Sequence, residues 1–385
     1  MKKYLESSKH FKKYTDPESG IMSYVLDSDS LPLTQSFYFT NPSATSDGRY
    51  VWFYCAFPPA ADAGYGRTLG LFDLESDTVT HFPDTMFLDA SPAVDVDDGS
   101  VYYCMPSGIW RRSPDPNGKP ERISAVPKEL RGRGKLLNLA THLSFSPDKA
   151  RLFLDANVAN SFIFGELDIK SGEYIPWCEF DYCMNHAQYN PQKENLILYA
   201  EDEWVDIMTS SFYKIRRDAE GRLMRLHLLE KGGEPIYIPP KYIEARHEWW
   251  SADGEKLYYV DWIHGTIRYD LRTGEYTEVD PRGTWHAHSS LDDKYLVADE
   301  NEIDGEKWYR GCPSRVHFYN TETNRAVNII TENPAVFTRQ NPSSYHIDPH
   351  PQFAVNDSVI IHTSTVIGKP SLTITPTNQL INATK

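Results

Sequence analysis

The stretch His247-Glu-Trp-Trp-Ser-Ala-Asp253 places a histidine six residues before the last residue of a polar turn. Four further segments repeat this arrangement, so five histidines share one register. Residues at equivalent positions of a repeat come together when the repeats stack around an axis. We therefore expect the five histidines to converge on one place, the candidate active site. The other four segments are His142-Leu-Ser-Phe-Ser-Pro-Asp148, His186-Ala-Gln-Tyr-Asn-Pro-Gln192, His286-Ala-His-Ser-Ser-Leu-Asp292 and His350-Pro-Gln-Phe-Ala-Val-Asn356.

These turns belong to a longer repeated unit that occurs seven times. Each unit reads as an inner strand, a polar turn and further alternating strands joined by short loops. Units of about forty to sixty residues with about four strands are typical of propeller blades. The sequence therefore predicts an all-β fold, a seven-bladed β-propeller with four-stranded antiparallel blades. The first turns are Ser46-Asp-Gly48, Asp97-Asp-Gly99, Ser146-Pro-Asp148, Asn190-Pro-Gln192, Ser251-Ala-Asp-Gly254, Ser290-Leu-Asp292 and Ala354-Val-Asn356.

The two ends of the chain are expected to close the ring. We treat residues 1–385 as a single propeller domain, with residues 1–18 as an N-terminal extension. The seventh unit is short after Leu372-Thr-Ile-Thr375, whereas Gly20-Ile-Met-Ser-Tyr-Val-Leu26 has the character of a strand. This N-terminal strand is expected to complete the last blade, because closure removes exposed sheet edges.

The composition narrows the class of ligand. Aromatic residues make up 13% of the 385 residues, which suits a strand-rich protein. The net charge of −15, from 54 acidic and 39 basic residues, argues against nucleic acid as a partner. An anionic sugar remains possible, because small anions are bound by local cationic groups or metal rather than by net charge.

The sequence also predicts the cellular location of the protein and the redox state of its cysteines. The basic start Met1-Lys-Lys3 is not followed by an apolar stretch with a cleavage site, and no run of eighteen apolar residues occurs. We therefore expect a soluble, cytoplasmic protein with no membrane partner. The five cysteines are odd in number and widely spread, which predicts reduced thiols.

One histidine at the start of a strand is more often a packing or hydrogen-bonded residue than a ligand, but five in one register favour a functional cluster. Residues 346, 348 and 350 alternate onto one face of a regular strand. His346, Asp348 and His350, with His286 from the neighbouring unit, would form a nitrogen and oxygen site for Mn, Fe, Ni or Zn. The alternative is a hydrogen-bonded network of histidine and aspartate with no metal.

Three segments taken together resemble the oligogalacturonate lyases, seven-bladed propellers of pectin degradation. They are His247-Glu-Trp-Trp250, His286 with Ser289 and Asp292, and Pro349-His-Pro-Gln-Phe353. The resemblance implies an Mn²⁺-type ion held by His286 and His350, with His247 as the Brønsted base. It also implies β-elimination on a short oligogalacturonate, in which the proton next to the uronate carboxylate is removed and a 4,5-unsaturated uronate is formed.

The chain departs from this family in two places. Where the family has Gln-x-x-His-Pro-His, this sequence has Tyr345-His-Ile-Asp-Pro-His350, so Asp348 and His346 are expected to replace two ligands. The substrate-binding arginine of the family aligns near Ser210 and Ser211, which leaves Arg217 further along the unit and Arg246 beside the base.

The expected site therefore has three groups of residues. The catalytic group is His247 and Arg246, and the metal group is His286, His346, Asp348 and His350. The oligosaccharide would contact His142, His186, Trp249, Trp250 and Arg217, although aromatic residues beside inner strands are more often part of the packing between blades.

Two other functions stay open at this point. One is a metal-independent lyase or glycosidase acting on a related uronate-containing glycan. The other is a non-catalytic propeller that serves as an interaction scaffold, with the histidines as packing residues. Bound metal together with an unsaturated product would distinguish the metal-dependent lyase from both of these alternatives.

Overall fold

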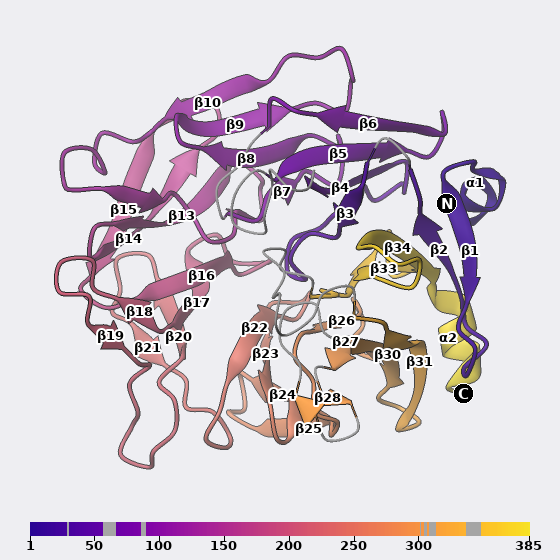
Figure 1. Ribbon diagram of the computed structural model, residues 1–385. Coiled ribbons are helices and arrows are strands. Elements are labelled where there is room, and N and C mark those ends of the chain that lie inside the picture. Colours follow the sequence, from indigo (N-terminus) through magenta and orange to yellow (C-terminus); the bar gives the residue numbers. More distant parts are fainter. Residues whose placement is uncertain are drawn as a thin grey trace.

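The computed structural model describes residues 1–28, 31–56, 67–85, 90–300, 302–303, 306–307, 313–335 and 348–385. Seven antiparallel sheets stand around a central axis, as Figure 1 shows. The predicted all-β, seven-bladed propeller is therefore confirmed. The described residues add two short helices, α1 (Lys2–Ser7) and α2 (Thr377–Ala383).

We number the blades along the chain, beginning after the N-terminal segment. Blade 1 contains β3 (Leu33–Gln35), β4 (Tyr50–Ala56), β5 (Thr68–Asp73) and β6 (Thr78–Phe82). Blade 2 contains β7 (Ala93–Val94), β8 (Val101–Met105), β9 (Gly108–Arg112) and β10 (Glu121–Ala125). Blade 3 contains β11 (Leu136–Asn138), β12 (Ser144–Phe145), β13 (Arg151–Val158), β14 (Ser161–Asp168) and β15 (Tyr174–Phe180).

Two of the remaining blades carry an inserted hairpin. Blade 4 contains β16 (Met184–Tyr189), β17 (Leu196–Glu201), β20 (Leu226–Glu230) and β21 (Ile236–Tyr237), with the hairpin β18 (Trp204–Val205) and β19 (Phe212–Tyr213). Blade 5 contains β22 (Arg246–Trp250), β23 (Lys256–Asp261), β24 (Gly265–Asp270) and β25 (Tyr276–Asp280). Blade 6 contains β26 (Ala287–Ser289), β27 (Tyr295–Glu300), β30 (Ser314–Asn320) and β31 (Arg325–Asn333), with the hairpin β28 (Glu302–Ile303) and β29 (Glu306–Lys307).

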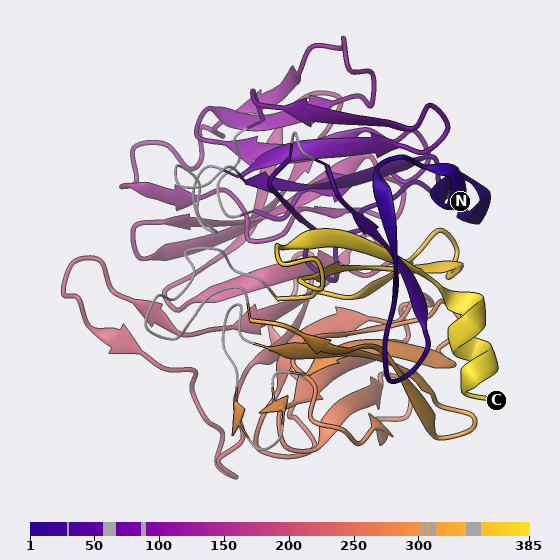
Figure 2. The ribbon, with the colours of Figure 1, turned by 45° about the vertical axis from the view of Figure 1, so that its right-hand side comes forward.

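Blade 7 is built from both ends of the chain. The C-terminal part supplies β32 (Gln352–Ala354), β33 (Val359–Ser364) and β34 (Ser371–Pro376), and the N-terminal part supplies β2 (Met22–Leu26) and β1 (Phe11–Thr15). Strand β2 pairs with β34, with Tyr24 opposite Ile374, so the predicted closure by an N-terminal strand is confirmed. Figure 2 shows these strands side by side. The segment 1–18 holds α1 and the fifth strand of this blade, β1.

The described residues form seven hydrophobic core clusters, each between two neighbouring blades. The second strand of each blade is apolar on both faces, because a blade is covered on each side by its neighbours. In β4, for example, Trp52 contacts the cluster with blade 2 and Phe53 the cluster with blade 7. Among the described residues, no helix has the length and apolar character needed to cross a membrane.

Candidate functional site

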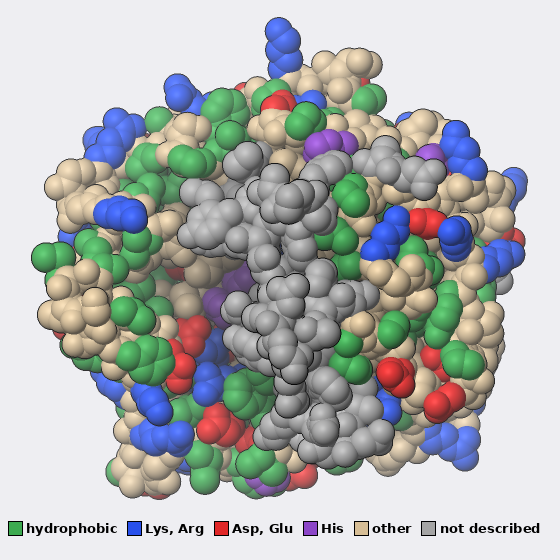
Figure 3. Space-filling view, in the orientation of Figure 1, with side chains coloured by type: hydrophobic (Ala, Val, Ile, Leu, Met, Phe, Trp, Pro, Cys, Tyr) green, Lys and Arg blue, Asp and Glu red, His purple; other side chains and the backbone are tan. Residues whose placement is uncertain are grey.

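The inner strands of blades 3 to 7 begin at one mouth of the central channel, and the five histidines of the shared register lie there. They line a cavity of about 340 Å³. In Figure 3, histidine side chains are visible in the hollow near the centre of this face. Further described lining residues come from the other blades and from the segments before the inner strands: Gln35, Ser36, Tyr38, Tyr54, Arg67, Ser91, Thr141, Trp285 and Asp348.

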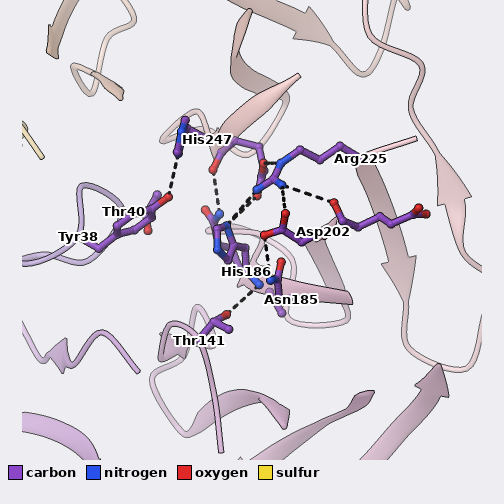
Figure 4. A network of polar contacts seen from close by, with 12 residues as sticks. Tyr38, Thr40, Thr141, Asn185, His186, Asp202, Arg225 and His247 are labelled. Atoms are coloured by element: carbon purple, nitrogen blue, oxygen red, sulfur yellow. Dashed lines mark hydrogen bonds and ion pairs between the residues drawn. The ribbon is translucent and has the colours of Figure 1, made fainter. Parts of the chain in front are cut away.

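Tyr38 stands in the middle of the histidines. Its ring stacks on His142 with centroids 4.1 Å apart and meets the ring of His350 edge-on at 4.9 Å. Its hydroxyl oxygen lies 3.3 Å from Nδ1 of His247 (Figure 4). The sequence reasoning missed Tyr38, because blade 1 has Asn41 at the histidine register. An aromatic residue just before that position was the signal available.

Three of the histidines have a left-handed backbone conformation, which L-residues rarely adopt. His186, His247 and His350 have φ values of +56°, +49° and +44°. In β16 and β22 the strand register shifts at this point, which marks a β-bulge. A bulge changes the direction of a side chain and is frequent beside active sites. Because a left-handed conformation costs on the order of 1 kcal/mol or more for a non-glycine residue, the surrounding structure must hold it in place.

Two carboxylates supply that support, each seven residues after the turn residue of its blade. Asp155 accepts hydrogen bonds from the backbone N–H of Thr141 at 2.6 Å and of Ala187, in the next blade, at 3.2 Å. Asp299 does the same across blades 6 and 7. It accepts from the backbone N–H of His286 at 2.7 Å and of His350 at 3.2 Å. These two aspartates were not among the predicted site residues, although they occupy the same position in two repeats.

Asp299 also fixes the ring of His286. One carboxylate oxygen lies 3.1 Å from Nδ1 of His286, and both side chains are only 2% exposed. The other ring nitrogen, Nε2, therefore faces away from Asp299. A histidine held through one nitrogen by a carboxylate is the usual arrangement of a metal ligand.

His286, Asp348 and His350 form the candidate metal group. Each offers one ligand atom, and these atoms lie within 4.8 Å of one another. Nε2 of His350 is 3.9 Å from a carboxylate oxygen of Asp348. Two imidazoles and a carboxylate suit divalent transition metals, including Mn²⁺. The remaining predicted ligand, His346, lies outside the described residues.

His247 lies directly beside this group. The centroid of its ring is 4.2 Å from that of His286. Burial, together with the neighbouring His286 and Arg225, lowers the pKa of His247 well below its usual value. The imidazole is therefore neutral near pH 7, the state in which it can accept a proton.

A buried ionic network lies behind the histidines (Figure 4). Arg225 donates to Glu248 at 2.9 Å and forms a second ion pair with Asp202 at 3.2 Å. His186 contacts both Arg225 and Glu248, at 3.3 and 3.4 Å. Burial alone would lower the pKa of Arg225, but the two carboxylates outweigh it and raise the pKa. The sequence reasoning missed Arg225 because the β18–β19 hairpin precedes it and contains the region of Ser210, where an arginine was sought.

The two arginines expected from the sequence do not line the cavity. Arg217 has a half-exposed side chain that pairs with Glu244 at 3.6 Å. Arg246 lies 3.5 Å from the same carboxylate and covers the ring of Trp262, at 4.8 Å from its centroid. Burial lowers the pKa of Arg246. Both guanidinium groups thus interact with residues of blades 4 and 5 or of the segment between them.

The two expected tryptophans lie in the packing between blades. Trp249 is 2% exposed, and its indole N–H donates to Ser289 at 3.1 Å. Trp250 is 9% exposed and donates to the carbonyl of Gln188 at 3.3 Å. Trp285, the third tryptophan beside the histidines, lines the cavity. Both tryptophans also line a second cavity of about 270 Å³, which shares His142 with the first.

The chain is similar to oligogalacturonate lyases. It is 24% identical over 220 residues to the oligogalacturonate lyase of Dickeya dadantii, which is 54% of this chain and 53% of that protein. It is 22% identical over 218 residues to the oligogalacturonide lyase of Pectobacterium atrosepticum, again 54% of this chain and 53% of that protein. The chain thus spans about half the length of the curated relatives it matches. No family model matches the chain.

Two solved structures have the same fold over nearly the whole chain. An oligogalacturonate lyase in complex with manganese has a TM-score of 0.70 at 17% identity, covering 95% of this chain and 96% of that one. The oligogalacturonate lyase of Vibrio parahaemolyticus has a TM-score of 0.71 at 18% identity with the same coverage. The resemblance inferred from three short segments is therefore confirmed, and the low identities make this chain a divergent relative.

Proposed function

We propose that this protein is a metal-dependent lyase that cleaves short uronate oligosaccharides, of the oligogalacturonate type, by β-elimination to a 4,5-unsaturated uronate. One observation carries the proposal. A neutral histidine, His247, lies beside the group of His286, Asp348 and His350 in one cavity. The similarity to oligogalacturonate lyases supports the same reaction.

The donor set fits a divalent ion, for which we propose Mn²⁺. His286, Asp348 and His350 would hold it, with Asp299 fixing the ring of His286 from behind. Bound there, the ion would neutralise charge that develops on the carboxylate of the reacting uronate.

His247 is the proposed base. Its Nδ1 lies towards Tyr38, so Nε2 is the nitrogen that remains to take the proton next to the carboxylate, at C5 of the uronate. The electron pair of that C–H bond forms the C4–C5 double bond, and the glycosidic oxygen leaves C4. A base with a lowered pKa is neutral at the pH where the reaction runs and needs no prior loss of a proton.

The proposal leaves out Arg246, Arg217, Trp249 and Trp250, because none of them lines the cavity among its described residues. His142 and His186 remain in the proposal as residues of the cavity lining that contact the substrate. Tyr38 joins them, since its ring contacts four of the five histidines and its hydroxyl reaches the fifth, His247.

The test is turnover of di- and trigalacturonate, followed by the ultraviolet absorbance of the conjugated product, with Mn²⁺ and after chelation. We expect metal-dependent absorbance that disappears in His247→Ala. His264→Gln is the matched control, because His264 is a half-exposed histidine of the same blade that pairs with Asp261 at 2.9 Å. A protein with metal bound and no activity on uronates would contradict the proposal. Turnover that survives chelation would favour the metal-independent alternative.

A further inference from the structure

A smaller cavity, of about 220 Å³, adjoins the histidine cavity between blades 3 and 4. We call it the amide pocket, because three asparagines line it. Thr141 belongs to the lining of both cavities, and Asn185 of the amide pocket directly precedes His186 of the histidine cavity. The amide pocket therefore lies directly beside the wall that His186 forms. The lining residues that matter below are Asn138, Thr141, Asp155, Asn157, Phe162 and Asn185.

Hydrogen bonds fix the wall that the two cavities share. The hydroxyl of Thr141 donates to Asp155 and accepts from the backbone N–H of His186 at 2.8 Å. Asp155 also accepts from the backbone N–H groups of Thr141 and Ala187, at 2.6 and 3.2 Å. Both carboxylate oxygens of Asp155 thus have donors within the protein. A ligand can lie across this wall without a change in its backbone.

Two acceptor oxygens of the amide pocket lack donors. The side-chain oxygen of Asn157 is buried without a hydrogen-bond partner among the described residues, and the residue is 8% exposed. The side-chain oxygen of Asn185 is buried and unpaired in the same way. The orientation of this amide is fixed, because its N–H₂ group donates to Asp202 at 3.2 Å. Unpaired buried carbonyl oxygens destabilise a fold and are rare, so two of them at one cavity indicate a ligand that supplies donors.

The charges around the amide pocket favour an uncharged ligand. Its described lining residues include no lysine or arginine. Arg225, which contacts His186, is 3% exposed and already paired with Glu248 and Asp202. A carboxylate in the pocket would face carbonyl oxygens and Asp155 with no cation to offset its charge. Hydroxyl groups, in contrast, donate to amide oxygens, and the ring of Phe162 offers an apolar surface to the C–H groups of a sugar.

We propose that the amide pocket binds an uncharged sugar of the same oligosaccharide whose uronate reacts beside His247. This inference rests on the proposed function and narrows its substrate to a mixed chain. The reacting sugar carries a carboxylate, and the sugar in the amide pocket carries only hydroxyl groups. A volume of about 220 Å³ is below the range of about 300–1,000 Å³ that is typical for drug-sized ligands, so it suits one sugar ring. A chain of uronates alone is then a poorer substrate than the mixed chain.

The test uses trigalacturonate and two trisaccharides made from it, in which the carboxylate of one terminal sugar, at either end, is reduced to the primary alcohol. The middle uronate, which can react in all three, keeps its carboxylate. We would measure kcat/KM with Mn²⁺ for the wild type, Asn157→Leu and Asn185→Ala. Asn320→Leu is the control, because Asn320 is a buried asparagine of blade 6 with a paired amide. It donates to the carbonyl of Thr384 at 3.2 Å and accepts from the N–H of Glu322 at 3.0 Å.

We expect the wild type to cleave one of the reduced trisaccharides about tenfold more efficiently than trigalacturonate, as for one or two neutral hydrogen bonds. Asn157→Leu and Asn185→Ala should lose most of this preference. Asn157→Leu should not lower the midpoint of thermal unfolding, because the side-chain oxygen of Asn157 has no partner among the described residues. Asn320→Leu should lower that midpoint and keep the preference. A purely structural role of Asn157 would not combine a lost preference with unchanged stability.

Four results would overturn the inference. If the wild type cleaves trigalacturonate at least as well as both reduced trisaccharides, the amide pocket takes no uncharged sugar, whereas the proposed function stands. If Asn157→Leu and Asn185→Ala keep the preference, it arises outside the amide pocket. Calorimetric binding of Ca²⁺ that is lost in both variants would assign the amide oxygens to a cation. If the metal-loaded wild type cleaves none of the three trisaccharides, the proposed function and this inference fail together.

Discussion

Replacing Asp299 by asparagine tests whether the carboxylates between blades organise the metal group. Asp299 accepts from two backbone N–H groups, those of His286 and His350, and lies 3.1 Å from Nδ1 of His286. Asparagine has one acceptor oxygen in place of two. Its amide N–H₂ group would therefore face at least one of the N–H groups that now donate to Asp299. The loss of a hydrogen bond to a charged group is about 1.5–3 kcal/mol.

That energy corresponds to a change in metal affinity of about 10- to 100-fold, which matches the usual effect of losing the partner of a metal ligand. The assay is titration of metal-free protein with Mn²⁺ by calorimetry. Asp155→Asn is the control, because Asp155 occupies the same position in blade 3 and supports no ligand of the metal group. The buffer should lie above the pKa of Asp155, which burial raises to about 6.

We expect both variants to lose stability and only Asp299→Asn to lose affinity for Mn²⁺. If Asp299→Asn binds Mn²⁺ as tightly as the wild type, the role of Asp299 in orienting His286 is refuted. Equal weakening in Asp155→Asn would instead mean that the loss is a general effect of loosening the propeller.

Three further outcomes follow from other contacts. Tyr38→Phe removes the hydroxyl beside Nδ1 of His247, so kcat on trigalacturonate should fall about tenfold. The midpoint of thermal unfolding should stay unchanged. An unchanged kcat would contradict a role of the Tyr38 hydroxyl in positioning the His247 ring. Glu248→Gln removes the more buried of the two carboxylates that pair with Arg225 and should lower the free energy of unfolding in urea by about 3–5 kcal/mol. A loss below about 1 kcal/mol would mean that water reaches this pair. Burial lowers the pKa of His362 to about 4, so the folded state binds fewer protons than the unfolded state, and the share of stability from this residue, about 3 kcal/mol, is present above about pH 6.5 and is lost as pH falls towards 4. His362→Gln should flatten the fall of the unfolding free energy over this range, and an equally steep fall would assign acid sensitivity to other groups.

The blade number and the closure of the ring could be predicted because they depend on local chemistry that repeats. A polar turn such as Ser251-Ala-Asp-Gly254 interrupts apolar strands at a regular interval, and its period alone distinguishes a propeller from a sandwich. Gly254 shows how strict this local chemistry is. It has a φ of +68°, and a Cβ there would lie 2.5 Å from the side chain of Asn190 in the neighbouring blade.

Of the site residues, those at equivalent positions of the repeat could be predicted from the sequence. The histidines share a register, and the cavity contains all five. Tyr38 and Arg225 lie outside the register of the histidines, so the alignment of repeats did not identify them. Each is brought to the site by a contact between distant segments, such as the stacking of Tyr38 on His142. Contacts of this kind depend on how blades pack and are not encoded in the periodicity of one strand.

The packing of the strand explains why Trp249 and Trp250 do not bind substrate in our proposal although they lie two and three residues after His247. The bulge at His247 shifts the register of β22 before the tryptophans. The left-handed residue directs the imidazole into the channel, and the regular strand after it turns both indoles into the packing on either side of the blade. One irregular residue therefore separates His247, which faces the cavity, from two packed indoles within four consecutive residues. A regular strand would place Trp249 on the same face as His247, whereas the bulge at His247 directs the imidazole and this indole to different surroundings.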